Sequence, residues 1–107
     1  MTVTVRDDPA ESRYEIYEGE LLAGFSDYRL TSKTIAFTHT EVDPAFGGRG
    51  LGNQLVTEAL DDASRRGLAV LPFCPYVRKI IAEHADTYLA LVPDRERGRF
   101  GLAQPAG

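Results

Sequence analysis

The chain has 107 residues, of which 43% are hydrophobic and 26% charged, a composition typical of one globular domain and unlike that of a disordered chain. Its 12 basic and 16 acidic residues leave a net charge of −4, which excludes a generally basic surface that would coat nucleic acid. One cysteine cannot form an internal disulfide, and the longest apolar run, residues 68–74, is too short to span a bilayer. We therefore expect a cytoplasmic protein with no nucleic-acid partner and no membrane segment.

Short runs of alternating apolar and polar residues indicate β-strands over the first 42 positions. Val3 and Val5 predict an edge strand that the sequence Asp7-Asp8-Pro9 breaks. Further strands are expected over residues 14–17, 22–30 and 34–42, with turns at 18–20 and 31–33. Because these connections are short, we expect the four strands to form an antiparallel meander.

The periodicity becomes helical at Leu51. The apolar stripe of this helix comprises Leu51, Leu55, Val56, Ala59, Leu60 and Ala63. The sequence Arg65-Arg66-Gly67 is typical of a helix end, because positively charged side chains stabilise the last turn of a helix and glycine is common just after it. Residues 68–73 are then predicted to form a buried strand parallel to the fourth, and a second helix is predicted over residues 76–84 with Pro75 in or near its first turn.

These elements predict an α+β fold, with a mixed sheet and helices packed on it. An antiparallel N-terminal meander is followed by a parallel strand–helix–strand unit and a C-terminal helix. We expect a single domain over residues 1–107. Within this domain, residues 1–12 form an edge strand and a turn, and residues 93–107 form a charged segment and a flexible tail that frays over residues 104–107.

A glycine-rich turn, residues 46–52, lies between the fourth strand and the long helix. Glycines let the backbone adopt positive φ and approach a ligand closely, and the helix start adds unpaired N–H groups and a positive dipole end. This turn, with the charge of Arg49, is suited to a phosphate group. A surface turn followed by a glycine-heavy helix start explains the same residues as well.

Two familiar nucleotide motifs do not match this turn. The dinucleotide fingerprint requires a third glycine, and Asn53 or Leu55 stands at that position in the two possible alignments. The phosphate loop of nucleotide hydrolases requires a lysine where this chain again has Asn53. The turn therefore predicts a pyrophosphate site without nucleotide hydrolysis.

The sequence Gly47-Gly48-Arg49-Gly50-Leu51-Gly52 follows directly after Glu41-Val42-Asp43-Pro44, and it resembles the acetyl-coenzyme-A signature of the GNAT acetyltransferase superfamily. That signature runs Gln or Arg, two residues, Gly, one residue, and Gly or Ala. Gly50 and Gly52 match its last two fixed positions, whereas Gly47 stands where Gln or Arg is usual.

The chain is also similar, over residues 13 to 92, to the minimal stand-alone GNAT-like family. The shared features are His39-Thr40, the glycine-rich loop, and the segment Pro72-Phe73-Cys74-Pro75-Tyr76-Val77. The family usually continues with His, Pro, an acid and Tyr. Here His84 is followed by alanine, and Tyr88 comes one residue late.

This resemblance implies that acetyl-coenzyme A is a substrate. In the GNAT fold the fourth and fifth strands are parallel and splay apart, the pantetheine arm lies between them, and the pyrophosphate rests on the loop amides. The cofactor-binding residues implied are Thr40, Glu41, Val42, Gly47, Gly48, Arg49, Gly50, Leu51, Gly52 and Asn53.

Three residues are candidates for catalysis. Cys74, at the end of the fifth strand, is either a nucleophile that carries the acetyl group or an inert core thiol. His39, assigned to the inward face that it shares with Ile35 and Phe37, is either a base or a satisfied core residue. Tyr76 is either a proton donor to the coenzyme-A thiolate or a packing residue at a helix start.

Other candidates are weaker. Glu41 is a possible base but equally a solvated acid, and His84 is interpreted as structural. Metal binding is not expected, because the two histidines and the cysteine lack the close spacing of zinc ligands.

The favoured function is transfer of an acetyl group from acetyl-coenzyme A to an unidentified amine, with or without a Cys74 intermediate. The first alternative is a coenzyme-A-binding or acyl-sensing module with little catalysis. The second is a small interaction protein whose glycine loop binds a phosphate-bearing partner, suggested by the charged segment Asp94 to Arg99.

Overall fold

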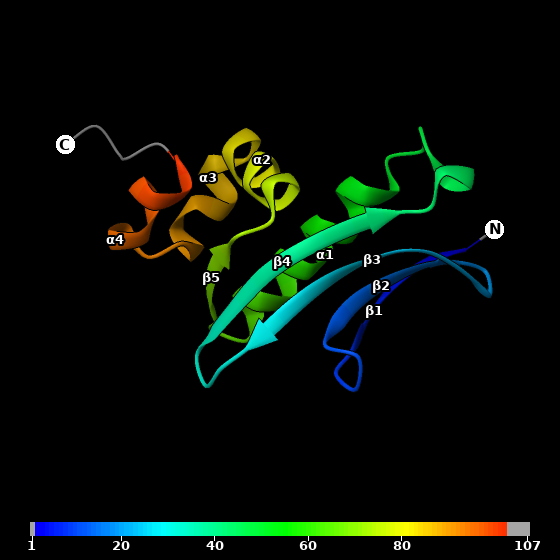
Figure 1. Ribbon diagram of the computed structural model, residues 1–107, viewed down its shortest axis with the longest axis horizontal. Coiled ribbons are helices and arrows are strands. Elements are labelled where there is room, and N and C mark those ends of the chain that lie inside the picture. Colours follow the sequence, from blue (N-terminus) through cyan, green and yellow to red (C-terminus); the bar gives the residue numbers. More distant parts are fainter. Residues whose placement is uncertain (1, 103–107) are drawn as a thin grey trace.

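The computed structural model describes residues 2–102 and contains one five-stranded sheet in the order β1-β2-β3-β4-β5 (Figure 1). The strands are β1 (Val3–Asp8), β2 (Arg13–Glu18), β3 (Leu21–Leu30), β4 (Thr34–Val42) and β5 (Ala69–Pro72). The first four are antiparallel, and β4 and β5 are parallel. The mixed α+β sheet predicted from the sequence is therefore confirmed.

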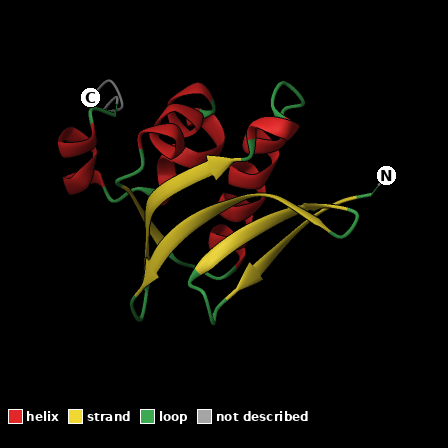
Figure 2. Ribbon diagram, turned by 45° about the vertical axis from the view of Figure 1, so that its right-hand side comes forward, coloured by secondary structure: helices red, strands yellow, loops and turns green. Residues whose placement is uncertain are grey.

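Helices connect and follow the last two strands. The longer ones are α1 (Leu51–Arg65) and α2 (Pro75–Glu83), followed by α3 (Ala85–Tyr88) and α4 (Asp94–Arg97). Short 3-10 turns are η1 (Pro44–Phe46), η2 (Leu89–Leu91) and η3 (Gly98–Phe100). Figure 2 shows the helices gathered on one face of the sheet, with the opposite face uncovered. No helix among residues 2–102 is long and apolar enough to cross a membrane.

The core lies between α1 and the covered face of the sheet. All six residues of the predicted apolar stripe of α1 are buried. They pack in one cluster with inward side chains of the strands, including Ile16, Ile35, Phe37 and Val70. The helix ends as the sequence predicts, because Gly67 adopts a positive φ of 68° just after it.

The first strand ends within the segment Asp7-Asp8-Pro9, where the sequence predicts a break. Its pairing with β2 continues to Asp8, which lies opposite Arg13. Asp7 accepts a hydrogen bond of 2.6 Å from the Tyr28 hydroxyl, so a charged residue is held inside the strand rather than ending it. The strand ends at Asp8, directly before Pro9, so the predicted break at Asp7-Asp8-Pro9 is confirmed, although both aspartates still belong to the strand.

The charged segment after residue 93 folds onto the core as α4 and η3. Arg97 is buried, donates a hydrogen bond of 3.0 Å to the Val92 carbonyl and forms an ion pair with Asp94. Phe100 and Leu102 are buried as well. The single C-terminal helix of the prediction is thus the first of several short ones, and the predicted tail at residues 104–107 lies outside the described residues.

A β-bulge interrupts the pairing of β3 with β4. Tyr28 pairs with Phe37 and Asp27 pairs with His39, so Thr38 is an extra residue in β4. An extra residue shifts the alternation of side chains, which places those after it on faces opposite to the ones expected. Downstream of the bulge, Thr40 therefore replaces His39 on the helix-covered face.

Candidate functional site

A cavity of about 370 Å³ opens on the helix side of β4, between that strand and the first turns of α1 and α2. It is lined by Thr40, Val42, Phe46, Gly47, Gly48, Gly50, Leu51, Gly52 and Tyr76. Most of the residues predicted to hold the coenzyme meet here, together with one catalytic candidate. Phe46 is an apolar wall that belongs to the same turn.

Beside this cavity, β4 and β5 separate from each other. The parallel pairing of β4 with β5 ends at Phe37 and Pro72. The last backbone hydrogen bond between the two segments, at 2.9 Å, runs from the Cys74 amide to the Phe37 carbonyl. The chain then turns into α2, whereas β4 continues to Val42. Among the described residues, the edge of β4 over residues 38–42 that faces away from β3 pairs with no strand, so this backbone is open to an extended ligand.

Most residues of the glycine-rich loop line this cavity, among them Gly47, Gly48, Gly50 and Gly52. Gly48 and Gly50 adopt φ values of 79° and 74°, a conformation that favours glycine. Gly47 donates to the Pro44 carbonyl at 3.1 Å, but within residues 2–102 no hydrogen bond engages the amides of residues 48–53. No side chain caps the start of α1 either. Unengaged donors at the positive end of a helix dipole are suited to an anion.

Arg49 does not line the cavity, contrary to the expectation that its charge adds to the phosphate site. Its guanidinium forms an ion pair with the largely buried Glu18 at the end of β2 and lies over the Phe46 ring, 5.6 Å from its centroid. This side chain ties the loop to the hairpin between β2 and β3. Asn53 and Glu41 are likewise absent from the cavity lining.

Gly52 and Tyr76 are in close contact across the cavity. A Cβ atom at position 52 would lie 2.9 Å from the Tyr76 hydroxyl oxygen and 3.3 Å from Val42 Cγ2, so only glycine lets the ring sit there. Burial raises the pKa of Tyr76, and the negative charge of Glu83 raises this pKa further. The hydroxyl therefore stays protonated at neutral pH and can donate a proton.

Cys74 lies just before α2 and is 3% exposed. Its Sγ donates a hydrogen bond of 3.4 Å to Thr40 Oγ1, and Thr40 Oγ1 lies 2.9 Å from Ser26 Oγ. Cys74 therefore contacts a residue of the cavity wall, beside the point where the strands part. Sequence reasoning missed Ser26, although its polar side chain interrupts the inward face of β3, where Tyr28 is also buried.

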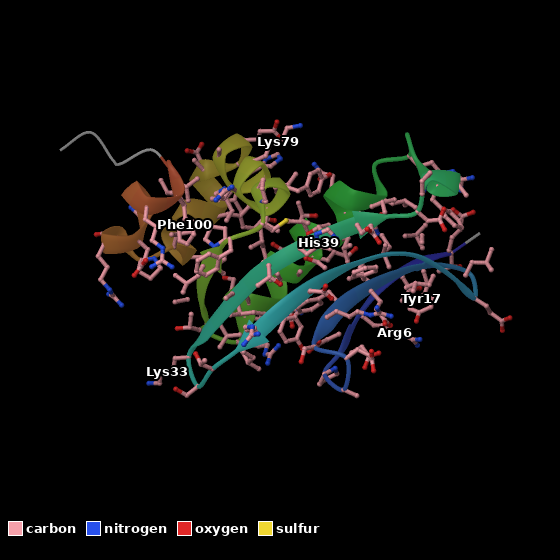
Figure 3. All side chains as sticks on the ribbon, in the orientation of Figure 1. Arg6, Tyr17, Lys33, His39, Lys79 and Phe100 are labelled. Carbon is pink, nitrogen blue, oxygen red and sulfur yellow. The ribbon has the colours of Figure 1, made fainter. Side chains whose placement is uncertain are left out.

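His39 is not on the inward face, and that prediction is wrong. Because of the bulge at Thr38, its side chain is 58% exposed on the uncovered face of the sheet (Figure 3). There it lies 3.5 Å from Glu41 and beside the Phe25 ring, at 6.2 Å between centroids. Thr40 and Cys74 face the other side, so this arrangement does not provide a base for the thiol.

The remaining polar candidates have structural surroundings. His84 lies between α2 and α3 with its ring edge-on to Tyr88, at 6.4 Å between centroids. No group of three potential metal ligands occurs within residues 2–102. In the charged segment, Arg97 pairs with Asp94 and Arg99 pairs with Glu96, so much of its charge is neutralised within the segment.

Comparison with known proteins gives one family. A family model described as GCN5-related N-acetyl-transferase matches residues 13–92, well over half of the chain. The matched stretch runs from the start of β2 to Val92 and includes every residue that lines the cavity. No curated protein matches the chain.

Proposed function

The chain belongs to the GCN5-related N-acetyltransferase family, and from this premise we propose that it transfers the acetyl group of acetyl-coenzyme A to an amine in the cavity beside β4. The observation that carries the proposal is that, within the described part of the chain, no hydrogen bond engages the amides of residues 48–53, next to the open edge of β4. The unengaged amides suit a pyrophosphate, and the open strand edge suits the amides of a pantetheine arm.

The two features support one direction for the bound coenzyme. With the pyrophosphate at the start of α1, the pantetheine arm follows the backbone of residues 40–42 toward the parting of β4 and β5. The thioester then reaches the neighbourhood of Cys74, whose sulfur contacts Thr40. This order of groups along one strand is the reason to place the chemistry there rather than on the uncovered face.

The transfer needs a proton for the coenzyme-A sulfur as it leaves. In direct transfer, the amine nitrogen bonds to the acetyl carbon, the carbon–sulfur bond breaks, Tyr76 protonates the departing thiolate, and water takes the proton that the amine loses. In the two-step form, the Cys74 thiolate, whose proton has left to water, bonds to the acetyl carbon while the carbon–sulfur bond of the coenzyme breaks and Tyr76 protonates the departing thiolate. The amine nitrogen then bonds to the acetyl carbon, the bond to Cys74 breaks, and water takes the amine proton. The Cys74 sulfur and Tyr76 regain their protons from water.

Binding is tested by calorimetric titration of the protein with acetyl-coenzyme A. Saturable binding is expected, and no heat of binding under conditions where the protein is folded would overturn the proposal. Mass spectrometry after mixing, without an amine, separates the two routes. A gain of one acetyl group that is lost in Cys74→Ala indicates the intermediate, whereas Cys74→Ala with full turnover indicates direct transfer.

A second candidate function is a coenzyme-A-binding module with little catalysis. It is favoured by one observation: within residues 2–102 no strand follows β5, so the acceptor side of Cys74 has no further strand wall. This alternative predicts tight binding without turnover. Measurable acetylation of any member of an amine panel would exclude it.

A further inference from the structure

The hydroxyl groups of Ser26 and Thr40 connect Cys74 to the core, and the chemistry described above does not use them. Ser26 on β3 is fully buried, at 0% exposed, and it is the register partner of Thr40 on β4. Their oxygens are 2.9 Å apart, and Thr40 Oγ1 is 3.4 Å from Cys74 Sγ. The three side chains form one chain of hydrogen bonds from Ser26 through Thr40 to Cys74, and its middle member, Thr40, lines the cavity.

The burial of Ser26 requires a reason. A buried hydroxyl is unfavourable unless it is hydrogen-bonded, and an alanine would fill the same place without that cost. Among the described residues, Thr40 is the side-chain partner of Ser26, and Thr40 is also the polar contact of the Cys74 sulfur. Ser26 therefore acts on Cys74 only through Thr40.

We propose that Ser26 is a positioning residue which, through Thr40, orients the Cys74 sulfur and stabilises its thiolate during acetyl transfer. The inference rests on the proposed function in its two-step form. In the thiol form, the sulfur donates to Thr40 and the Thr40 hydroxyl donates to Ser26. After the thiol proton has left to water, both bonds reverse, so that Ser26 donates to Thr40 and Thr40 donates to the sulfur anion.

The same arrangement serves both steps of the transfer. The thiolate bonds to the acetyl carbon while the coenzyme-A sulfur leaves and takes its proton from Tyr76. When the amine later displaces the cysteine, the sulfur leaves as a thiolate and again accepts the Thr40 hydrogen bond. The hydroxyls of Ser26 and Thr40 stabilise the negative charge on the Cys74 sulfur, and each hydroxyl keeps its proton over the complete reaction.

The experiment exploits the presence of a single cysteine in the chain. Thiolate formation is followed by absorbance near 240 nm as a function of pH, with Cys74→Ala subtracted as the blank. Ser26→Ala is expected to move the midpoint of the thiol titration upward by about half to one pH unit, as expected for the loss of one hydrogen bond. Thr40→Val is expected to move it further, because it removes the contact with sulfur itself.

Two variants serve as controls. Thr40→Ser keeps the hydroxyl and is expected to restore a wild-type titration, which a purely packing role for Thr40 would not produce. Ser32→Ala, at the exposed turn between β3 and β4, is expected to have no effect. The thermal unfolding of each variant verifies that the folded protein is being titrated, and the Thr40 pair decides the question if Ser26→Ala does not fold.

The outcomes separate this inference from the proposed function. Wild-type midpoints in both Ser26→Ala and Thr40→Val would overturn the inference, as would a Thr40→Ser titration that matches Thr40→Val. The absorbance titration needs no coenzyme, so it remains readable if acetyl-coenzyme A does not bind. In that case the proposed function fails while the thiol measurement still stands.

Discussion

At the scale of single residues, Gly52 controls the shape of the cavity. An alanine there would place its Cβ 2.9 Å from the Tyr76 hydroxyl, so the Tyr76 ring, which lines the cavity proposed for the coenzyme, must shift. Overpacking of this kind costs about 1–3 kcal/mol, against a gain of about 1 kcal/mol from replacing a helical glycine. We expect Gly52→Ala to fold and to bind acetyl-coenzyme A roughly tenfold more weakly in calorimetry.

The matched control is Gly98→Ala. No atom lies within 4 Å of a Cβ built at Gly98, and its φ of −61° suits any residue. This variant should bind like the parent. Equal affinity of Gly52→Ala and the parent would show that the contact with Tyr76 does not shape the coenzyme site.

Tyr76 offers a second test at this scale. Its raised pKa keeps the hydroxyl protonated through neutral pH, so the ability to donate is lost only when the solution becomes strongly alkaline. Tyr76→Phe is expected to lower kcat by about a hundredfold while leaving the affinity for acetyl-coenzyme A nearly unchanged. Steady-state kinetics combined with calorimetry checks both quantities, and an unchanged kcat would assign Tyr76 a packing role.

At the scale of elements, an ion pair holds the glycine-rich loop against the end of β2. Arg49 is half exposed and Glu18 is largely buried, so solvent screens the pair and its contribution is about 1 kcal/mol or less. If Arg49 anchors the loop, Arg49→Ala and Glu18→Gln should each weaken acetyl-coenzyme A binding about two- to fivefold. Calorimetry of the two variants at equal ionic strength measures this.

The Glu18 variant decides between two roles for the arginine. If Arg49 instead contacts a phosphate, the removal of Glu18 frees its charge, and Glu18→Gln would bind more tightly than the parent. Tighter binding in that variant would contradict the anchoring role.

The elements that the sequence predicts well are those whose signal is local. The bounds of β4 follow from its β-branched and aromatic residues and the buried stripe of α1 follows from its periodicity, and the structure confirms both. The orientation of His39 could not be predicted in this way, because the bulge at Thr38 depends on the register with β3. The pairing of Arg49 with Glu18 joins residues 31 positions apart, and α3 and α4 are too short to show a helical period.

At the scale of the whole molecule, buried tyrosines connect stability to alkaline pH. Burial, together with the hydrogen bond to Asp61, raises the pKa of Tyr88 to about 12, and the pKa values of Tyr14 and Tyr28 are raised as well. Unfolding returns each phenol to a pKa of about 10. The folded state therefore keeps these protons longer, and the stabilisation is complete below about pH 10 and is lost as the pH rises toward 12.

Tyr88→Phe should reduce this alkaline loss without abolishing it. The free energy of unfolding, measured in urea at steps between pH 9 and 12, is expected to fall less steeply in the variant than in the parent. Part of the slope remains because Tyr14 and Tyr28 still titrate. Parallel curves for the two proteins would mean that Tyr88 does not contribute to it.

The parting of β4 and β5 has a consequence for the handling of this protein. An unpaired strand edge is a template on which a strand of another chain can pair, and such pairing leads to aggregation. A bound coenzyme would cover that edge. Concentrated solutions that contain coenzyme A should therefore stay clear longer than solutions without it, so the proposed ligand would also protect the protein against self-association.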